Sequence, residues 1–217
     1  MALAIFDLDD TLIDGDSASL WLRFLVAEGL APADMLPREA AMMADYRAGR
    51  LDMECYMAFT LQPLRGRRVD EVGEWARRYI AAEVAGRVFP AALAALARYR
   101  ADGWRRLVIS ATGEHLVAPI AAHLGVDEVL AIRLQQHEGR YTGATEGVLT
   151  YRHGKTERLA AWLAQAGESL AGSHGYSDSI NDVPLLDAVA SGFVVNPDPG
   201  LTALAVERGW TRLQWRR

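Results

Sequence analysis

Short apolar segments alternate with longer amphipathic ones from residue 90 to residue 217. The expected strands lie in four segments: "RRLVIS", "EVLAIRL", "SLAGSHGYSD" and "SGFVVN". Segments with helical periodicity separate them, and "HEGRYTG" adds an expected hairpin. Strands that alternate with helices are typical of parallel sheets built from βαβ units. The pattern therefore predicts an α/β fold with a parallel sheet.

A long helical block near the start of the chain is the second feature. The apolar run "LAIF" predicts a buried first strand. Helical periodicity then continues from Ser17 to about Phe89 with almost no strand signal. The chain has 217 residues, of which 51% are hydrophobic, and this is enough for one sizeable core. We therefore expect a sheet-containing core at residues 1–15 and 89–217, with residues 16–88 inserted as a helical cap.

Composition argues against several classes of protein. The net charge of −5 argues weakly against nucleic acid or an anionic membrane as the main partner. The longest apolar run, around "FPAALAALARY", is well short of the ~20 residues that span a bilayer. The start "MALAIFDLDD" has no basic leader. Cys55 is the single cysteine, so we expect no intrachain disulfide and a reducing, cytoplasmic location.

Other common sites lack support in the sequence. The five histidines show no zinc spacing. No GxGxxG, P-loop or GxSxG pattern is present, which leaves dinucleotide, nucleoside triphosphate and serine-hydrolase sites unsupported. The sequence predicts no particular oligomeric state.

Acidic residues gather at the exit of the first strand. The stretch "AIFDLDDTLIDGDS" contains five of them: Asp7, Asp9, Asp10, Asp14 and Asp16. Like charges placed so close repel each other, and such a cluster normally surrounds a cation. The exit of the first strand is therefore a candidate cation site.

Other strand ends add polar groups to the same edge of the sheet. "RRLVIS" ends in Ser110, "GYSD" ends in Asp178, and Asp182 follows one helical turn later. Lys155 opens the helix that precedes "GYSD". Ligands of open α/β sheets bind at the carboxyl ends of strands. Oxygen ligands suit Mg²⁺, which typically takes one or two carboxylates plus phosphate oxygens, so we expect Mg²⁺ and a phosphate here.

Each of these residues also has a purely structural interpretation. Asp16 precedes an apolar helical run and fits a helix N-cap. Ser110 could satisfy a backbone group at the strand end, and Asp182 could stabilise a helix N-terminus by its charge. Lys155 alone would be a solvated surface lysine. The pair Asp7 and Asp9 fits such an interpretation poorly, because two inward-facing acids need a counter-charge.

Four motifs together resemble those of the haloacid dehalogenase superfamily. "DLDDTL", "VIS", "GKTERL" and "YSDSIND" match them in order and cover nearly the whole core. Within the superfamily the chain resembles the phosphoserine phosphatase-like branch, in particular a group of phosphoserine and histidinol-phosphate phosphatases. The segments shared with that group are "DGDS", "APIAAHLG", "GRYTG", "YSDSIND" and "VNPDP". The resemblance implies a Rossmann-like parallel sheet core with a small helical cap inserted after the first strand.

The same resemblance implies a set of catalytic roles. Asp7 would be the nucleophile that forms an aspartyl-phosphate. Asp9 would protonate the leaving alkoxide and then deprotonate the attacking water. Ser110 would donate a hydrogen bond to the phosphoryl group, and Lys155 would neutralise charge on the nucleophile and phosphate.

Metal and substrate ligands are also implied by the resemblance. Mg²⁺ would bind the carboxylates of Asp7 and Asp178 and the backbone carbonyl of Asp9. Asp182 would support the metal through water or orient Lys155. The implied substrate-binding residues are Asp16, Ala111 and Asn181.

Two positions bear on the choice of substrate. Asp16 matches the family's acid that binds a substrate ammonium group. An ungapped alignment places Thr60 where phosphoserine phosphatases have an arginine that binds the substrate carboxylate. This combination favours a phosphorylated amino alcohol such as histidinol phosphate over phosphoserine, although Arg65, Arg67 or Arg68 could replace the arginine.

The sequence therefore predicts a magnesium-dependent phosphomonoesterase. Its substrate would be a small phosphorylated metabolite of amino-acid biosynthesis, with histidinol phosphate first and phosphoserine as the alternative. A phosphomutase of the same superfamily and a catalytically silent metabolite-binding module are further alternatives.

Overall fold

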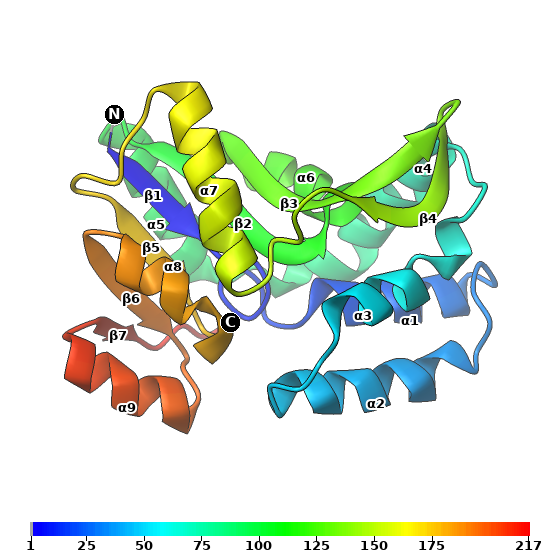
Figure 1. Ribbon diagram of the computed structural model, residues 1–217, viewed down its shortest axis with the longest axis horizontal. Coiled ribbons are helices and arrows are strands. Elements are labelled where there is room, and N and C mark those ends of the chain that lie inside the picture. Colours follow the sequence, from blue (N-terminus) through cyan, green and yellow to red (C-terminus); the bar gives the residue numbers. More distant parts are fainter. Residues whose placement is uncertain (1) are drawn as a thin grey trace.

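The computed structural model of the chain describes residues 2–217. Over these residues the strands form one seven-stranded sheet in the order β4-β3-β2-β1-β5-β6-β7 (Figure 1). Neighbouring strands run parallel, except for the antiparallel pair of β3 and β4. The strands are β1 (Leu3–Phe6), β2 (Arg105–Gly113), β3 (Glu128–His137), β4 (Arg140–Glu146), β5 (His174–Ser177), β6 (Ser191–Val195) and β7 (Thr211–Leu213). The prediction of an α/β fold with a parallel sheet is confirmed.

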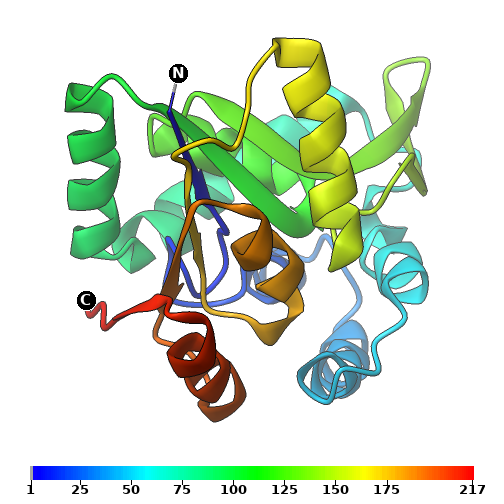
Figure 2. The ribbon, with the colours of Figure 1, turned by 60° about the vertical axis from the view of Figure 1, so that its left-hand side comes forward.

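Helices cover both faces of this sheet. The α-helices are α1 (Ser17–Ala27), α2 (Met35–Arg47), α3 (Met53–Thr60), α4 (Val69–Tyr79), α5 (Pro90–Ala101), α6 (Glu114–His123), α7 (His153–Ala166), α8 (Val183–Ala188) and α9 (Pro199–Arg208). Figure 2 shows α5 and α7 on opposite sides of the sheet. Among residues 2–217, no helix has the length and apolar character needed to cross a membrane.

The two faces follow from the alternation of side chains along the strands. On one face Ile5 packs in a cluster with Leu159 of α7 and Leu185 of α8. On the other face Phe6 packs edge-on against Tyr99 of α5, with ring centroids 6.0 Å apart. Both faces are therefore buried, and the interior strands read as nearly continuous apolar runs.

Two elements at the edges of the sheet differ in how well the sequence predicts them. The hairpin in "HEGRYTG" joins β3 to β4, and its turn residues Glu138 and Gly139 have φ angles of 49° and 71°. Positive φ at both central residues matches the twist of a two-residue hairpin, and this prediction is confirmed. Strand β7 was not predicted. It has three residues and pairs with β6 at the edge of the sheet. Three residues are too few to show the alternating apolar pattern that identifies a strand in the sequence.

The helical segment leaves the sheet after β1 and returns to it at α5. Its entry and exit lie side by side: the Asp14 N–H donates to the Arg87 carbonyl (2.8 Å), and the Phe89 N–H donates to the Leu12 carbonyl (3.1 Å). Pro90 then opens α5 at a position where no N–H is needed. The end of β1 and the start of α1 are thereby fixed relative to each other.

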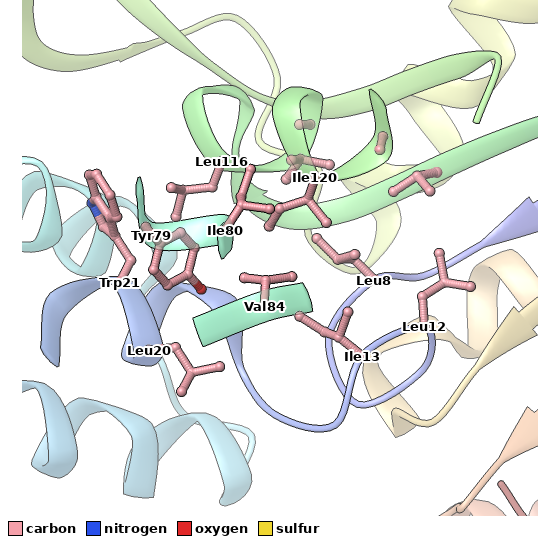
Figure 3. Close-up of a cluster of buried hydrophobic side chains, with 14 of the residues drawn as sticks. Leu8, Leu12, Ile13, Leu20, Trp21, Tyr79, Ile80, Val84, Leu116 and Ile120 are labelled. Atoms are coloured by element: carbon pink, nitrogen blue, oxygen red, sulfur yellow. The ribbon is translucent and has the colours of Figure 1, made fainter. Parts of the chain in front are cut away.

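One hydrophobic cluster joins the helical segment to the sheet (Figure 3). Trp21 of α1 packs edge-on against Tyr79 at the end of α4, with ring centroids 5.3 Å apart. Leu116 and Ile120 of α6 belong to the same cluster and are fully buried. Because this cluster crosses from helices to sheet without a break, the predicted division into a core (1–15 and 89–217) and a cap (16–88) stays a prediction.

Candidate active site

The carboxyl ends of β1, β2 and β5 open into a cavity of about 980 Å³, which the helical segment closes from the other side. All the residues that the sequence predicts for the site line it: Asp7, Asp9, Asp16, Ser110, Ala111, Lys155, Asp178, Asn181 and Asp182. Their separation in sequence reaches 175 residues, and the parallel order of the strands brings them together. Their individual roles stay predictions.

Lys155 lies at the bottom of the cavity between two carboxylates. Its Nζ donates to Asp7 Oδ1 and to Asp182 Oδ2, each at 2.6 Å. All three side chains are buried. Burial raises the pKa of Asp7 to about 7, although the Lys155 charge acts in the opposite direction. The pKa of Lys155 is raised despite its burial, because Asp182 and Asp7 face it.

Asp9 is held at both of its carboxyl oxygens. Oδ1 accepts the Ser17 backbone N–H at 2.7 Å, and Oδ2 accepts the Thr112 hydroxyl at 3.0 Å. Burial raises the pKa of Asp9 well above its usual value, and the charges of Asp16 and Asp7 add to this effect. A carboxyl with a raised pKa can carry the proton that a general acid must donate.

Asp178 and Asp182 are held by hydroxyl groups. Thr11 donates its hydroxyl proton to Asp178 Oδ1 (3.1 Å), and Ser177 donates to Asp182 Oδ2 (2.7 Å). Burial raises the pKa of Asp178 well above its usual value, and Asp7 contributes repulsion. Asp182 also accepts a hydrogen bond from Lys155, and the predicted alternatives for it, support of the metal through water or orientation of Lys155, stay predictions.

Ser110 satisfies a backbone group and also lines the cavity. Its hydroxyl oxygen accepts the Thr112 N–H at 3.1 Å, as the structural interpretation expects. Its carbonyl accepts the Thr150 hydroxyl at 2.5 Å. The strand end is thereby fixed, with the Ser110 oxygen at the cavity wall.

The donor set can be tested against a divalent cation. In residues 2–217, no three His, Cys, Asp or Glu side chains are grouped as a ready metal site. Mg²⁺ does not need such a group, since one or two carboxylates plus waters and substrate oxygens suffice. Asp7 is buried and Asp178 is half-buried, and their carboxylate charges repel each other. A cation between them would relieve this repulsion, so the oxygen-rich site fits a hard divalent cation.

Asp16 and Asn181 both line the cavity. Asp16 is the N-cap of α1, since its Oδ1 accepts the Ser19 N–H at 2.6 Å. The structural interpretation of Asp16 is confirmed; Asp16 also lines the cavity, and its role in substrate binding stays a prediction. Asn181 accepts a hydrogen bond from Arg152 Nε at 3.0 Å. Arg152 was not predicted as a site residue. It also donates a hydrogen bond to the Gly49 carbonyl (2.8 Å) in the helical segment.

The structure corrects the argument drawn from Thr60. The Thr60 hydroxyl donates to the Tyr56 carbonyl one turn earlier (3.0 Å), and Thr60 does not line the cavity. Instead Arg23 and Arg47 lie in its wall. The identity of residue 60 therefore gives no evidence for or against a carboxylate partner in the cavity.

The three other arginines considered for that role lie outside the cavity wall. Arg67 pairs with Glu71 (3.3 Å), and Arg68 pairs with Asp70 (2.7 Å). Arg65 packs its side chain against Gly143 of the β3–β4 hairpin. These residues belong to the junction of the hairpin and the helical segment.

Sequence reasoning also missed a buried acid in the cavity wall. Glu39 of α2 is only 6% exposed, and it accepts the Ser19 hydroxyl. Burial raises its pKa, and Asp16 contributes to the rise. The sequence of α2 does not show that Glu39 belongs to the site, because the rotation of the helix decides which of its side chains face the cavity.

Comparisons with known proteins agree with this geometry. A family model described as haloacid dehalogenase-like hydrolase matches residues 4–187. A histidinol-phosphatase of Neisseria meningitidis serogroup C (strain 8013) is 36% identical, with 99% of each chain covered. Phosphoserine phosphatase SerB1 of Mycobacterium tuberculosis (strain ATCC 25618 / H37Rv) is 30% identical, and the match covers 96% of this chain and 69% of that protein.

A solved structure has nearly the same fold. The crystal structure of a protein of unknown function from Bordetella pertussis Tohama I matches with a TM-score of 0.91 and 36% identity. The match covers 98% of this chain and 97% of that chain. The predicted family and the predicted enzyme class are both confirmed. The chain belongs to the haloacid dehalogenase-like hydrolase family, and it is a phosphatase.

Proposed function

We propose that the protein hydrolyses a phosphorylated amino alcohol, histidinol phosphate first, through an aspartyl-phosphate on Asp7. The observation that carries the proposal is the placement of the Asp7 carboxylate at the bottom of the cavity. Lys155 fixes one of its oxygens, and Asp9 lies two residues further along the same strand exit. A fixed nucleophile beside a proton donor supports two-step phosphoryl transfer.

In the first step an Asp7 carboxylate oxygen attacks phosphorus. The bond between phosphorus and the ester oxygen breaks, and its electron pair stays on that oxygen. Asp9 gives its proton to this oxygen, so the oxygen leaves as a neutral hydroxyl group of the alcohol rather than as an alkoxide. Lys155 holds Asp7 in place throughout.

In the second step a water oxygen attacks the phosphorus of the aspartyl-phosphate. Asp9, now ionised, takes a proton from this water. The bond between phosphorus and Asp7 breaks, which releases inorganic phosphate and restores the Asp7 carboxylate. Ser110 lies at the cavity wall, where its hydroxyl can donate to a phosphoryl oxygen.

Asp7, Asp178 and the backbone carbonyl of Asp9 would hold a Mg²⁺ ion. When bound, the ion would offset the repulsion between the carboxylates and a phosphate dianion and stabilise charge in the transition state. The repulsion between the Asp7 and Asp178 carboxylates, which a cation would relieve, supports this assignment.

Two acids support an amine-bearing substrate. Asp16 and Glu39 both line the part of the cavity formed by the helical segment. A substrate ammonium group between the phosphate site and these acids would gain charge-assisted hydrogen bonds. Histidinol phosphate carries such a group, and the similarity to a histidinol-phosphatase over the full chain supports the same choice.

Phosphoserine is the second candidate, and Arg23 and Arg47 favour it. Both line the cavity, and a guanidinium group can bind a carboxylate through two parallel hydrogen bonds. Phosphoserine has the carboxylate that histidinol phosphate lacks. Both candidates carry the ammonium group that the acids would bind, and they differ in whether they also use the arginines.

The ratio of kcat/KM for histidinol phosphate to that for phosphoserine tests this choice. We expect the wild type to favour histidinol phosphate. Asp16→Asn should lower kcat/KM for both amines by roughly tenfold to a hundredfold, the effect of one lost charge-assisted hydrogen bond. Asparagine still caps α1, so hydrolysis of p-nitrophenyl phosphate should change far less.

The outcomes separate the candidates. A wild-type preference for phosphoserine that is lost in Arg23→Gln or Arg47→Gln would establish the second candidate instead. Either preference places the enzyme in amino-acid biosynthesis. The single cysteine supports a reducing cytoplasm as its location.

A further inference from the structure

The Thr112 hydroxyl donates to Asp9 Oδ2 at 3.0 Å. Thr112 is only 5% exposed and lines the same cavity as Asp9. The opposite oxygen of Asp9 accepts the Ser17 N–H at 2.7 Å. The two donors come from different parts of the fold, because Thr112 ends β2 and Ser17 begins α1.

The backbone of β2 is irregular where this contact is made. Pairing of β2 with β3 loses its regular register between Ile109 and Gly113. Such irregularities commonly re-aim a side chain near an active site. In this strand the irregular residues are Ser110, Ala111 and Thr112, and all three line the cavity.

We infer that Thr112 is a positioning residue that fixes the Asp9 carboxyl group for proton transfer to the leaving oxygen. The inference rests on the proposed function, in which Asp9 is the general acid and base. Thr112 itself exchanges no proton with the substrate, and it acts only through Asp9.

Two arguments explain why the Asp9 carboxyl group needs the Thr112 hydroxyl in addition to the Ser17 N–H. With the Ser17 N–H alone, the group can turn about its bond to Cβ, because a single hydrogen bond does not fix a plane. Ser17 belongs to the helical segment, whereas Thr112 belongs to the sheet that carries Asp7, so the second donor ties the Asp9 carboxyl group directly to the sheet. Proton transfer needs hydrogen-bond distance to the leaving oxygen, and a misplacement of about 1 Å can cost ~10²-fold in rate.

The test uses two substrates that differ mainly in their leaving group. Phenyl phosphate and p-nitrophenyl phosphate are similar in size, but phenol is a much weaker acid than p-nitrophenol. Loss of proton donation therefore slows phenyl phosphate more. The measured quantity is the ratio of kcat/KM for p-nitrophenyl phosphate to kcat/KM for phenyl phosphate.

Thr112→Val keeps the shape of the side chain and removes the donor. We expect it to raise this ratio about tenfold or more. Thr112→Ser restores a hydroxyl and should return the ratio to within about threefold of wild type. Asp9→Asn removes the acid itself and should raise the ratio further, toward the ~10²–10⁴-fold typical of a lost general acid.

Thr150→Val is the matched control. Thr150 is also fully buried beside β2, but its hydroxyl donates to the Ser110 carbonyl and not to Asp9. Its loss should lower kcat/KM for both aryl phosphates by the same factor. Thermal unfolding of each variant verifies that it is folded, and Thr112→Ala serves if the valine variant does not fold.

Each outcome decides between the inference and the proposed function. If Asp9→Asn raises the ratio while Thr112→Val and Thr112→Ala do not, Thr112 has only a structural role and the inference is wrong. If Asp9→Asn leaves the ratio unchanged, Asp9 is not the proton donor, and the proposed mechanism fails together with the inference. A raised ratio in Thr112→Val that serine restores supports the inference.

Discussion

The Nζ atom of Lys155 lies 2.6 Å from Asp7 Oδ1, in a site where both side chains are almost fully buried. The same atom lies 2.6 Å from Asp182 Oδ2. One ammonium group thus binds two carboxylates away from bulk water, and Asp182 keeps Lys155 directed at Asp7. Without Asp182, the Lys155 ammonium group would keep Asp7 as a partner but lose one of its two charge-assisted hydrogen bonds.

Asp182→Asn tests this arrangement. The change is nearly isosteric, but it removes a charge that faces the Lys155 ammonium group. We expect the free energy of unfolding to fall by about 1.5–3 kcal/mol, the effect of one lost charge-assisted hydrogen bond, and kcat to fall because Lys155 is held less firmly against Asp7. Chemical denaturation and steady-state kinetics measure the two effects. Asp187→Asn is the control, since its exposed pair with Arg208 contributes only ~0–1 kcal/mol. Equal destabilisation by the two variants would contradict the role given to Asp182.

Removal of divalent cations should stop turnover. We expect EDTA to abolish hydrolysis and Mg²⁺ to restore it, while Ca²⁺ restores little because it takes more ligands at longer distances. Mg²⁺ should also raise the Tm of the wild type by mass action, and this shift should be lost in Asp178→Asn. The Tm measurement reports binding independently of activity. Full activity after exhaustive chelation would rule out a metal-dependent site.

Arg152 connects the catalytic side of the cavity to the helical segment. It donates to Asn181 Oδ1 and to the Gly49 carbonyl, and its φ of 51° is unusual for a residue other than glycine. Arg152→Ala should raise KM by about tenfold, because Asn181 and the loop at Gly49 lose a shared partner. Arg50→Ala is the control, since exposed Arg50 pairs only with nearby Asp45. If both variants bind substrate equally well, Arg152 does not organise the cavity.

His115 should make the protein sensitive to acid. Its two ring nitrogens are buried and have no hydrogen-bond partner among the described residues, and its ring packs against Trp21 and Tyr141. Burial lowers its pKa from 6.5 to about 3. The unfolded chain therefore binds a proton that the folded chain does not, so stability is lost as the pH falls from about 6.5 toward 3.

His115→Phe should remove this loss. Between pH 7 and pH 4.5, the variant should lose on the order of 2 kcal/mol less stability than the wild type. Subtracting the wild-type curve cancels the titration of all other groups. His123→Phe, at the exposed end of the same helix, should leave the acid dependence unchanged. Parallel curves for wild type and His115→Phe would show that His115 is not responsible.

The residues at strand ends were predictable because short stretches of sequence fix them. Asp7 and Asp9 leave β1 together, and the parallel order of the sheet places them beside Ser110 and Asp178. Thr112 could have been predicted as a site residue in the same way, because it lies two residues after Ser110 near the end of the same strand. These positions depend on local backbone geometry.

The side of the cavity formed by the helical segment was not predictable in the same way. Which side of a helix faces the cavity depends on its rotation, and tertiary packing sets that rotation. Glu39, Arg23 and Arg47 reach the cavity from α1 and α2, whereas Thr60 bonds within α3. An ungapped alignment carries no information on this rotation. It therefore compared the carboxylate-binding arginine with Thr60, which lies outside the cavity wall.

The central claim is that Asp7 carries the phosphoryl group during turnover. Reaction with substrate, rapid acid quench and borohydride reduction convert an aspartyl-phosphate to homoserine, which mass spectrometry of the N-terminal peptide locates. We predict homoserine at position 7 in the wild type and none in Asp7→Asn, whose amide cannot act as the nucleophile and whose turnover should be abolished. Homoserine at another residue, or near-normal turnover by purified Asp7→Asn, would contradict the account.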